Sequence, residues 1–305
     1  MTHRLSFICL LLAALLTTTA NAAPLNARLT LKNKQKWDAE LKGRHGDLVT
    51  LIESGKTTEV SLPITEITSI EFRLDLEKTG AIEKFDANNF KAAAAALQAV
   101  LPPTFPYLDA KNNVLPYVSL LLRALYWSEQ YRETLSTAET LLARLPDDSF
   151  KRELQLWRIL ALLESGRKTD AEIELERMGP VPRKDDLAAM YFYARSTIQW
   201  ANQQWEPAHI TATQLVVFRP KDLEWLPAGL YLTARGYGQM RAYDTANQIL
   251  DELQRFFPQS RWVPLIPKLQ EAWKQQREAD EKARAEKEKE EAKYRIQPAR
   301  KDTTP

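Results

Sequence analysis

The chain has 305 residues, and its 42 Lys and Arg nearly balance its 40 Asp and Glu, which leaves a formal charge of +2. This near neutrality provides no basic surface of the kind that nucleic acid requires. Only 9 residues are glycine, although average usage would give roughly twenty. Because glycine disfavours helices and builds phosphate-binding loops, its scarcity favours a helical protein over a turn-rich β protein or a Gly-loop nucleotide enzyme.

Residues 1–22 have the features of a secretory signal peptide. Arg4 precedes an apolar stretch at residues 5–16, and the segment ends in the small-residue pattern that signal peptidase cleaves. We expect cleavage after Ala22 and a periplasmic or secreted protein without a transmembrane anchor, because a span needs ~20 apolar residues. Cys9 is the only cysteine. The mature chain is therefore expected to contain no disulfide, cysteine-ligated metal or cysteine nucleophile.

Residues 23–76 show the period-2 alternation of short β-strands in five runs. The turn signals between them lie at residues 32–34, 43–46 and 54–56 and at Pro63. We expect a long bent hairpin from residues 36–43 and 47–53, closed by a strand at residues 64–72. These strands predict a small all-β, barrel-like module whose edges are paired. The order resembles that of the small SH3-like or Sm-like barrels.

From residue 81 to residue 273, apolar residues recur at helical spacing, beginning with an alanine run at residues 92–96. Within this region one pattern recurs with steps of 3, 4, 3 and 5 residues, although its second copy lacks the final proline. The copies are Tyr131, Thr134, Ala138, Leu141, Pro146; Lys168, Ala171, Leu175, Met178; Trp205, Ala208, Ala212, Leu215, Pro220; and Tyr243, Ala246, Leu250, Leu253, Pro258. Their starts are 37, 37 and 38 residues apart. We interpret each copy as the second helix of a hairpin that is too small to bury its own face, so that neighbouring hairpins must stack.

This spacing resembles the tetratricopeptide repeat (TPR) over about residues 115–260. The last copy matches best, because Ala234 and Tyr237 stand where the family has a small residue and an aromatic in its first helix. The period exceeds the family's 34 residues by three or four, and Glu129 replaces the usual turn glycine. The resemblance implies a mainly α protein, a TPR-like α-solenoid after the β module. The alternatives are a related helical-hairpin solenoid with longer loops and an irregular helical bundle.

The sequence offers no catalytic constellation. After the expected processing, the histidines are His45 and His209, one in each module, which are too few for a zinc site or a histidine-dependent nucleophile. Gly236-Tyr237-Gly238 is too short for a dinucleotide loop, and no Gly-Lys-Ser/Thr phosphate cradle is present. We therefore expect a protein that is not an enzyme, with no catalytic, metal-binding or cofactor-binding residues.

The resemblance to TPR proteins implies a concave face formed by the first helix of each hairpin. Tyr, Trp and Arg are frequent interface anchors, because they bury a large area and keep a polar group. The partner-binding residues expected on this face are Arg123, Tyr126, Tyr193, Thr197, Trp200, Tyr231 and Arg235. The predicted function is a non-catalytic exported scaffold that binds a protein or peptide partner of the cell envelope. The alternative is a cell-wall polymer-binding or hydrolase-accessory protein, and hydrolysis would need paired carboxylates ~5 to 9.5 Å apart in a cleft.

Residues 274–305 form a charged segment that we expect to be an exposed helix ending in disorder at Pro298. Charge pairs four residues apart, such as Asp280 with Arg284, favour the helix. No apolar seam continues beyond Trp273, so the pattern does not favour a coiled coil.

Overall fold

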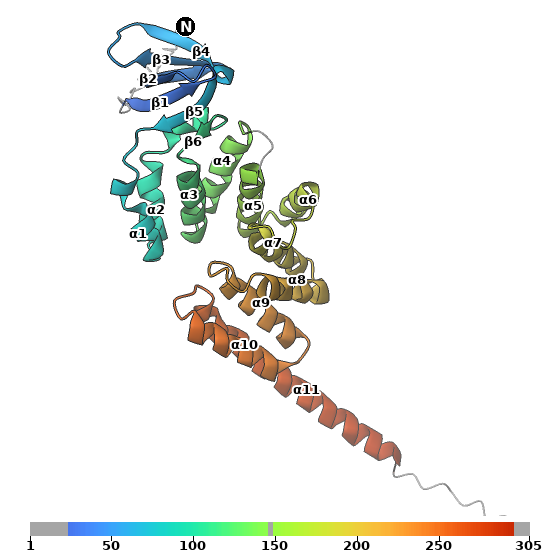
Figure 1. Cartoon of the computed structure of the whole chain (residues 1–305). Helices are drawn as coiled ribbons and strands as arrows, with labels where there is room; N and C mark the ends of the chain where they lie inside the picture. Colours follow the sequence, from blue (N-terminus) through green and yellow to red (C-terminus); the bar gives the residue numbers. More distant parts are fainter. Residues whose placement is uncertain (1–23, 146–148, 296–305) are drawn as a thin grey trace, which may run out of the picture. The chain divides into compact units, whose positions relative to one another are not determined.

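The computed structural model describes residues 24–145 and 149–295, so the expected signal peptide and the end of the tail lie outside the described residues. The chain divides into two compact units (Figure 1). Among the described residues, one unit comprises residues 24–80 and 96–118, and the other comprises residues 81–95, 119–145 and 149–295. Residues 96–118 thus group with the strands in one compact unit. The domain boundaries expected from the sequence stay a prediction.

The β unit is built on one six-stranded sheet. Its strands are β1 (Leu25–Leu31), β2 (Lys36–His45), β3 (Leu48–Glu53), β4 (Glu59–Pro63), β5 (Ile67–Phe72) and β6 (Lys111–Asn112). The order is β4-β3-β2-β1-β5-β6, with antiparallel pairs throughout except for the parallel pair of β5 and β6. The five predicted strands are confirmed. Side chains on β1, β2, β3 and β5 are buried in the core, among them Leu29, Leu51 and Ile70, whereas β4 has no buried side chain.

Two details of the sheet differ from the prediction. The closing strand begins at Ile67, because residues 64–66 after Pro63 form a 3-10 turn. The sixth strand was not predicted, since two residues are too short to show an alternation. The side chain of Asn113 holds it in place by accepting a hydrogen bond from the Phe72 backbone N–H at 2.9 Å and donating one to the Phe72 carbonyl at 3.0 Å. The likeness to SH3-like or Sm-like barrels stays a prediction.

The chain then forms α1 (Ala81–Asp86), α2 (Phe90–Gln98) and a 3-10 helix, η3 (Pro102–Tyr107). The alanine run lies in α2, as its helix propensity predicts. The helix stops before Pro102, because proline cannot continue the backbone hydrogen bonds of a helix.

The rest of the helical unit is a succession of four hairpins. Their helices are α3 (Leu115–Trp127) with α4 (Tyr131–Leu142), α5 (Ser149–Glu164) with α6 (Lys168–Met178), α7 (Ala188–Ala201) with α8 (Trp205–Phe218), and α9 (Leu226–Gln239) with α10 (Tyr243–Phe256). The second helices begin at the first residue of each predicted copy, and the small and apolar positions at steps 3, 4 and 3, such as Ala208, Ala212 and Leu215, are buried or half-buried. Each hairpin packs on the next through contacts such as α4 with α5 and α8 with α9. The unit is therefore a TPR-like α-solenoid.

All four hairpins share one turn conformation. The second of its three residues lies in the left-handed region, with φ of 63° at Glu129, 77° at Gly166, 59° at Gln203 and 64° at Arg241. Only one of these residues is glycine, the residue that adopts this conformation without steric cost. The turn is thus set by the packing of the flanking helices and not by a glycine in every repeat.

Two glycines of α9 allow neighbouring helices to approach closely. A Cβ atom at Gly236 would lie 2.1 Å from Nδ1 of His209 on α8, and one at Gly238 would lie 2.2 Å from Cε2 of Trp273. Such distances are sterically excluded, so any larger residue would force the helices apart. Gly236-Tyr237-Gly238 is therefore a packing element.

The last helix, α11 (Ile266–Arg295), closes the end of the solenoid and then continues into solvent. Ile266 and Trp273 lie in the hydrophobic core of the last hairpin. Asp280 pairs with Arg241 at 3.0 Å, so this carboxylate is engaged across helices. From residue 281 to residue 293 every side chain is exposed, which confirms the exposed helix.

Candidate functional site

Two loops of the helical unit carry tryptophans onto the first helices of the hairpins. Trp225, which directly precedes α9, is only 4% exposed. Its ring centroid lies 5.1 Å from those of Trp127 and Tyr193, 5.9 Å from that of Trp157 and 6.4 Å from that of Tyr126. These separations are typical of favourable aromatic contacts. Trp225 therefore joins α3, α5 and α7 in one aromatic cluster.

Trp262, in the loop between α10 and α11, extends this cluster. Its ring stacks on that of Tyr231 at 5.1 Å and lies edge-on to that of Tyr193 at 5.9 Å. Trp225 and Trp262 are 37 residues apart, and each is followed two residues later by proline. The loops thus repeat one device, a tryptophan placed just ahead of a helix and directed into the aromatic cluster.

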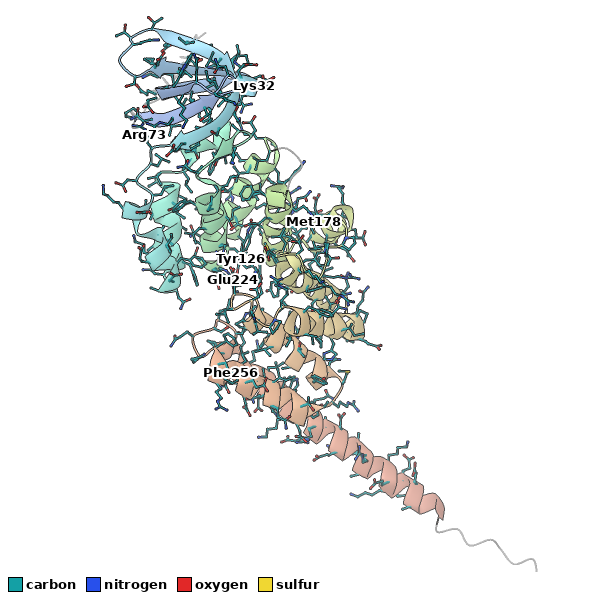
Figure 2. The ribbon with its side chains drawn as sticks, in the orientation of Figure 1. Lys32, Arg73, Tyr126, Met178, Glu224 and Phe256 are labelled. Carbon is teal, nitrogen blue, oxygen red and sulfur yellow. The ribbon has the colours of Figure 1, made fainter. Side chains whose placement is uncertain are left out.

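Glu224 supplies the polar contact beside Trp225. Its carboxylate accepts a hydrogen bond from Nε1 of Trp127 at 2.6 Å and pairs with Nη2 of Arg123 at 3.0 Å. Figure 2 labels Glu224 and Tyr126 in this region. Glu224 thus connects the loop to α3. Arg123 in turn connects α3 to α1, because its guanidinium lies 4.7 Å from the ring of Phe85.

Arg261 plays the corresponding part beside Trp262. Its guanidinium lies 5.6 Å from the ring of Trp127 and 5.5 Å from that of Trp262. It also donates a 3.5 Å hydrogen bond to the Tyr131 hydroxyl and pairs with Glu129 at 3.8 Å. One side of this arginine is therefore stacked on aromatic rings, while its polar edge faces the first hairpin turn.

The tyrosine hydroxyls inside the cluster remain protonated. Burial raises the pKa of Tyr126 and of Tyr193 well above the ordinary value for tyrosine. The Tyr126 hydroxyl donates a 3.1 Å hydrogen bond to Oε1 of Glu164 at the end of α5. The Tyr126 hydroxyl thus acts as a hydrogen-bond donor that joins α3 to α5.

A groove of about 720 Å³ opens beside the cluster, and we call it the aromatic groove. Its apolar lining is Phe85, Phe90, Trp127, Leu223, Pro227, Phe256, Phe257, Pro258 and Trp262. Its polar lining is Asp86, Asn88, Arg123, Glu129, Glu224, Gln259, Ser260 and Arg261. Leu223 is 72% exposed and Phe256, labelled in Figure 2, is 64% exposed. Large apolar side chains exposed beside such a groove are typical of a binding surface.

The structure places the predicted partner-binding residues in two groups. Tyr126, Tyr193 and Tyr231 lie in the aromatic cluster, and Arg123 lines the aromatic groove. Trp200 lies elsewhere, with its ring 4.9 Å from that of Trp205 and 4.3 Å from the Arg235 guanidinium. Thr197 is half-buried, and its hydroxyl has no hydrogen-bond partner among the described residues.

The predicted partner-binding residues differ in how far they are exposed to a partner. Tyr126, Tyr193 and Trp200 are buried against other parts of the chain, whereas Arg123 is half-buried and Arg235 is exposed. A role for these residues in partner binding stays a prediction. Substituting the three buried rings would first test stability.

Glu224, Trp225, Arg261 and the exposed residues of the groove are not among the site residues predicted from the sequence. Their signal was present, because Trp-x-Pro recurs after 37 residues, the period of the repeat. A loop residue is hard to place from periodicity, however, since periodicity describes helices and strands. Only the packing shows that these loops turn into the cluster.

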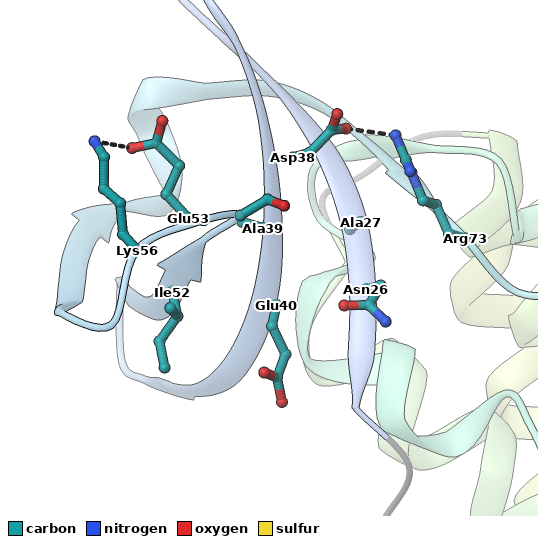
Figure 3. A pocket seen from close by; sticks show the side chains of 11 residues that line it. Asn26, Ala27, Asp38, Ala39, Glu40, Ile52, Glu53, Lys56 and Arg73 are labelled. Carbon is teal, nitrogen blue, oxygen red and sulfur yellow. Dashed lines mark hydrogen bonds and ion pairs between the residues drawn. The ribbon is translucent and has the colours of Figure 1, made fainter.

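A second hollow, of about 390 Å³, lies on the β unit (Figure 3). Asp38 accepts hydrogen bonds from Arg28 at 3.0 Å and Arg73 at 2.6 Å, and the Arg28 contact lowers the pKa of Asp38. Across the hollow, Glu53 pairs with Lys56 at 2.5 Å. These lining carboxylates are neutralised by their own neighbours, so the hollow has no unpaired charge on them to select a ligand.

Among residues 24–145 and 149–295, no three His, Cys, Asp or Glu side chains are grouped so that they could hold a metal ion. In the same part of the chain, no helix combines the length and the apolar character needed to cross a membrane.

No protein-family model and no curated protein matches the chain. Similar solved structures include two crystal structures of one protein region, the nearly identical TPR-like repeats of a Podosopora anserina protein assigned as a kinesin light chain. One is 18% identical, covers 61% of this chain and 97% of its own, and has a TM-score of 0.41; the other is 17% identical, covers 59% and 93%, and has a TM-score of 0.40. A third is YrrB, a TPR protein described as having an unusual peptide-binding site, with 13% identity, coverage of 62% and 88%, and a TM-score of 0.34. Because these scores are low, the TPR-like character of this chain rests on its own hairpins.

Proposed function

We propose that this protein is a non-catalytic, exported scaffold that binds a protein or peptide partner in the aromatic groove. The observation that carries the proposal is the exposure of Leu223 and Phe256 beside a groove that the described residues leave open. Apolar side chains of this size are normally covered, and a peptide with apolar anchors would cover them. Export is supported by the signal-peptide pattern of residues 1–22.

The groove combines apolar walls with charges that are already oriented. Arg123 is held by Glu224, and Arg261 is held by Tyr131 and Glu129, so both side chains are fixed before a partner binds and lose little freedom on binding. The surrounding aromatic rings provide large, rigid contact areas. The groove is therefore suited to an extended segment with apolar side chains, and the affinity would come mainly from the apolar anchors.

Site-specific photo-crosslinking in intact cells tests this proposal. A photoreactive residue at Leu223 or Phe256 is expected to give the same discrete adduct, identified by mass spectrometry. Met240 is the matched control, because it is 50% exposed and does not line the aromatic groove. An adduct of equal yield at Met240, or no adduct at either groove position, would contradict a binding role for the groove.

Binding to the identified partner is then measured with Phe256→Glu, which is expected to weaken affinity at least tenfold, while Met240→Glu leaves it unchanged. Cell fractionation and the mass of the mature N-terminus test export separately. A mature chain beginning at Ala23 outside the cytoplasm is the expected result.

The aromatic rings of the groove also suit a second function, the binding of cell-wall polymer, because such rings stack on sugars. Two of the groove carboxylates, Glu224 and Glu129, are paired with Arg123 and Arg261, which favours binding over hydrolysis. Co-sedimentation with purified cell wall tests this function. Retention on the wall that Phe256→Ala abolishes would favour it over a protein partner.

A further inference from the structure

The outward face of α8 is apolar, although α8 is the second helix of its hairpin and packs inward through other residues. Ile210 is 51% exposed, Val217 is 61% exposed and Phe218 is 40% exposed. Between Glu206 and Arg219 the chain has no Asp, Glu, Lys or Arg. The inward face is supplied by Ala208, Ala212 and Leu215, which are fully buried. The helix is thus apolar on both sides, a pattern typical of a helix that is covered on both sides.

The last hairpin provides an internal comparison, because it repeats the α7–α8 hairpin 38 residues later. The outward positions of α8 hold Ile210, Thr213, Gln214 and Val217. The corresponding positions of α10 hold Gln248, Asp251, Glu252 and Arg255, all polar or charged. The fold of the hairpin therefore does not require apolar residues at these positions. Phe218 has an apolar counterpart in Phe256, but Ile210 and Val217 have none, so these two residues serve something other than the packing of the solenoid.

A shallow hollow of about 290 Å³ lies along the same face. It is lined by Arg183, His209, Ile210, Thr213, Gln214, Val217 and Phe218. The guanidinium of Arg183 covers the ring of Phe218 at 4.5 Å and marks its edge. The face thus presents projecting aliphatic side chains beside a depression that can receive one, the complementary halves of knobs-into-holes packing.

The two ends of this face carry opposite charge. Glu206 is exposed in the first turn of α8, while Arg183, Arg219 and Lys221 lie at its other end. Asp186 pairs with Arg219 at 3.4 Å and leaves Arg183 and Lys221 to give this end a basic character. Such a face complements a copy of itself in the antiparallel orientation, because the acidic end of each helix then meets the basic end of the other.

We propose that α8 forms an antiparallel, two-fold symmetric contact between two copies of this chain. The axis passes between Thr213 and Gln214, so that Ile210 of each copy lies against Val217 of the other. The stripe spans about three turns of helix. The area that it can bury is therefore smaller than the roughly 800 Å² per partner of a standard interface. Self-association is therefore reversible and depends on concentration.

Analytical ultracentrifugation of the full chain, purified as its cells process it, tests the proposal. The weight-average mass is expected to rise from monomer towards dimer with concentration. The double variant Ile210→Gln with Val217→Arg carries the residues of α10 at these positions and is expected to stay monomeric with an unchanged circular dichroism spectrum. Ile173→Gln, which changes an apolar residue 47% exposed on α6, is the matched control and keeps the dimer. A wild-type chain that is monomeric at every concentration overturns the proposal, as does a double variant that dimerises like wild type.

Disulfide trapping tests the geometry. Cys9 is the only native cysteine, so Gln214→Cys in a Cys9→Ser background introduces a single reporter. Its position near the axis is expected to give a covalent dimer on mild oxidation, whereas Ile173→Cys gives none. A Gln214→Cys variant that dimerises in ultracentrifugation but forms no disulfide-linked dimer would place the contact elsewhere and overturn the antiparallel arrangement.

Discussion

The variant Trp225→Ala tests whether the loop before α9 is part of the solenoid core or a loop that opens to admit a ligand. The side chain is 4% exposed and its ring lies within 5.1 to 6.4 Å of four aromatic rings on α3, α5 and α7. Truncation of a buried tryptophan costs ~3 to 5 kcal/mol, since it removes buried apolar area and leaves a cavity. Because these rings come from three hairpins, we expect the upper part of this range for Trp225→Ala.

The assay is denaturant unfolding followed by far-ultraviolet circular dichroism, which reports mainly on the helical unit. Leu223→Ala is the matched control in the same loop, because Leu223 is 72% exposed. We expect the control to change the free energy of unfolding by about 0.5 kcal/mol or less. It should nevertheless weaken partner binding, since Leu223 lines the aromatic groove.

A loss below about 1 kcal/mol for Trp225→Ala would refute this reasoning, because a core ring cannot be removed so cheaply. If the same variant also lost partner binding, Trp225 would be a residue that the ligand contacts directly. The loop would then be a cover that opens, and the aromatic groove would extend beneath it.

Three further predictions concern the repeats. In the left-handed turn, Gly166→Ala is expected to lower and Gln203→Gly to raise the free energy of unfolding, each by up to about 1 kcal/mol, measured by denaturant titration. Gly238→Ala is expected to lower the free energy of unfolding by ~1 to 3 kcal/mol, because its Cβ would collide with Trp273. Thermal unfolding measures this loss. Burial lowers the pKa of His209, so the unfolded chain takes up a proton first, and stability should fall as the pH drops below about 6.5. His209→Gln should reduce this slope in denaturant titrations between about pH 7 and pH 5.5.

Each of these predictions has a control or an outcome that contradicts it. A stabilising Gly166→Ala would mean that the turn relaxes out of its left-handed conformation. Gly43→Ala is the control for Gly238→Ala, because a Cβ at Gly43 meets nothing within 4 Å and should cost little. An unchanged pH slope in His209→Gln would show that His209 is hydrated and that other groups set the slope.

Sequence periodicity located the elements of the helical unit closely. The second helices start at Tyr131, Lys168, Trp205 and Tyr243, the first residues of the predicted copies. A repeated helical hairpin must place small and apolar residues at fixed steps, because each hairpin packs on a similar neighbour. The alternation of strands located five strands of the sheet for the same kind of reason.

The candidate site was less accessible to such reasoning. Arg123 was predicted and lines the aromatic groove, whereas Tyr126 and Tyr193 are enclosed by Trp225 and Trp262. The concave face expected from the TPR resemblance carries two loops of the chain itself. A pattern of helices cannot show this, because a loop residue of any polarity can turn inwards or outwards.

The sequence by itself determined the repeated hairpins, the β strands and the charged last helix, because period, propensity and breaker residues act over a few neighbours along the chain. Tertiary structure decided what the surfaces offer. It buried Trp225, left Phe256 and the outward face of α8 exposed, and joined Arg123 to Glu224 over 101 residues of chain. Such contacts depend on how distant segments pack, and no local pattern encodes them.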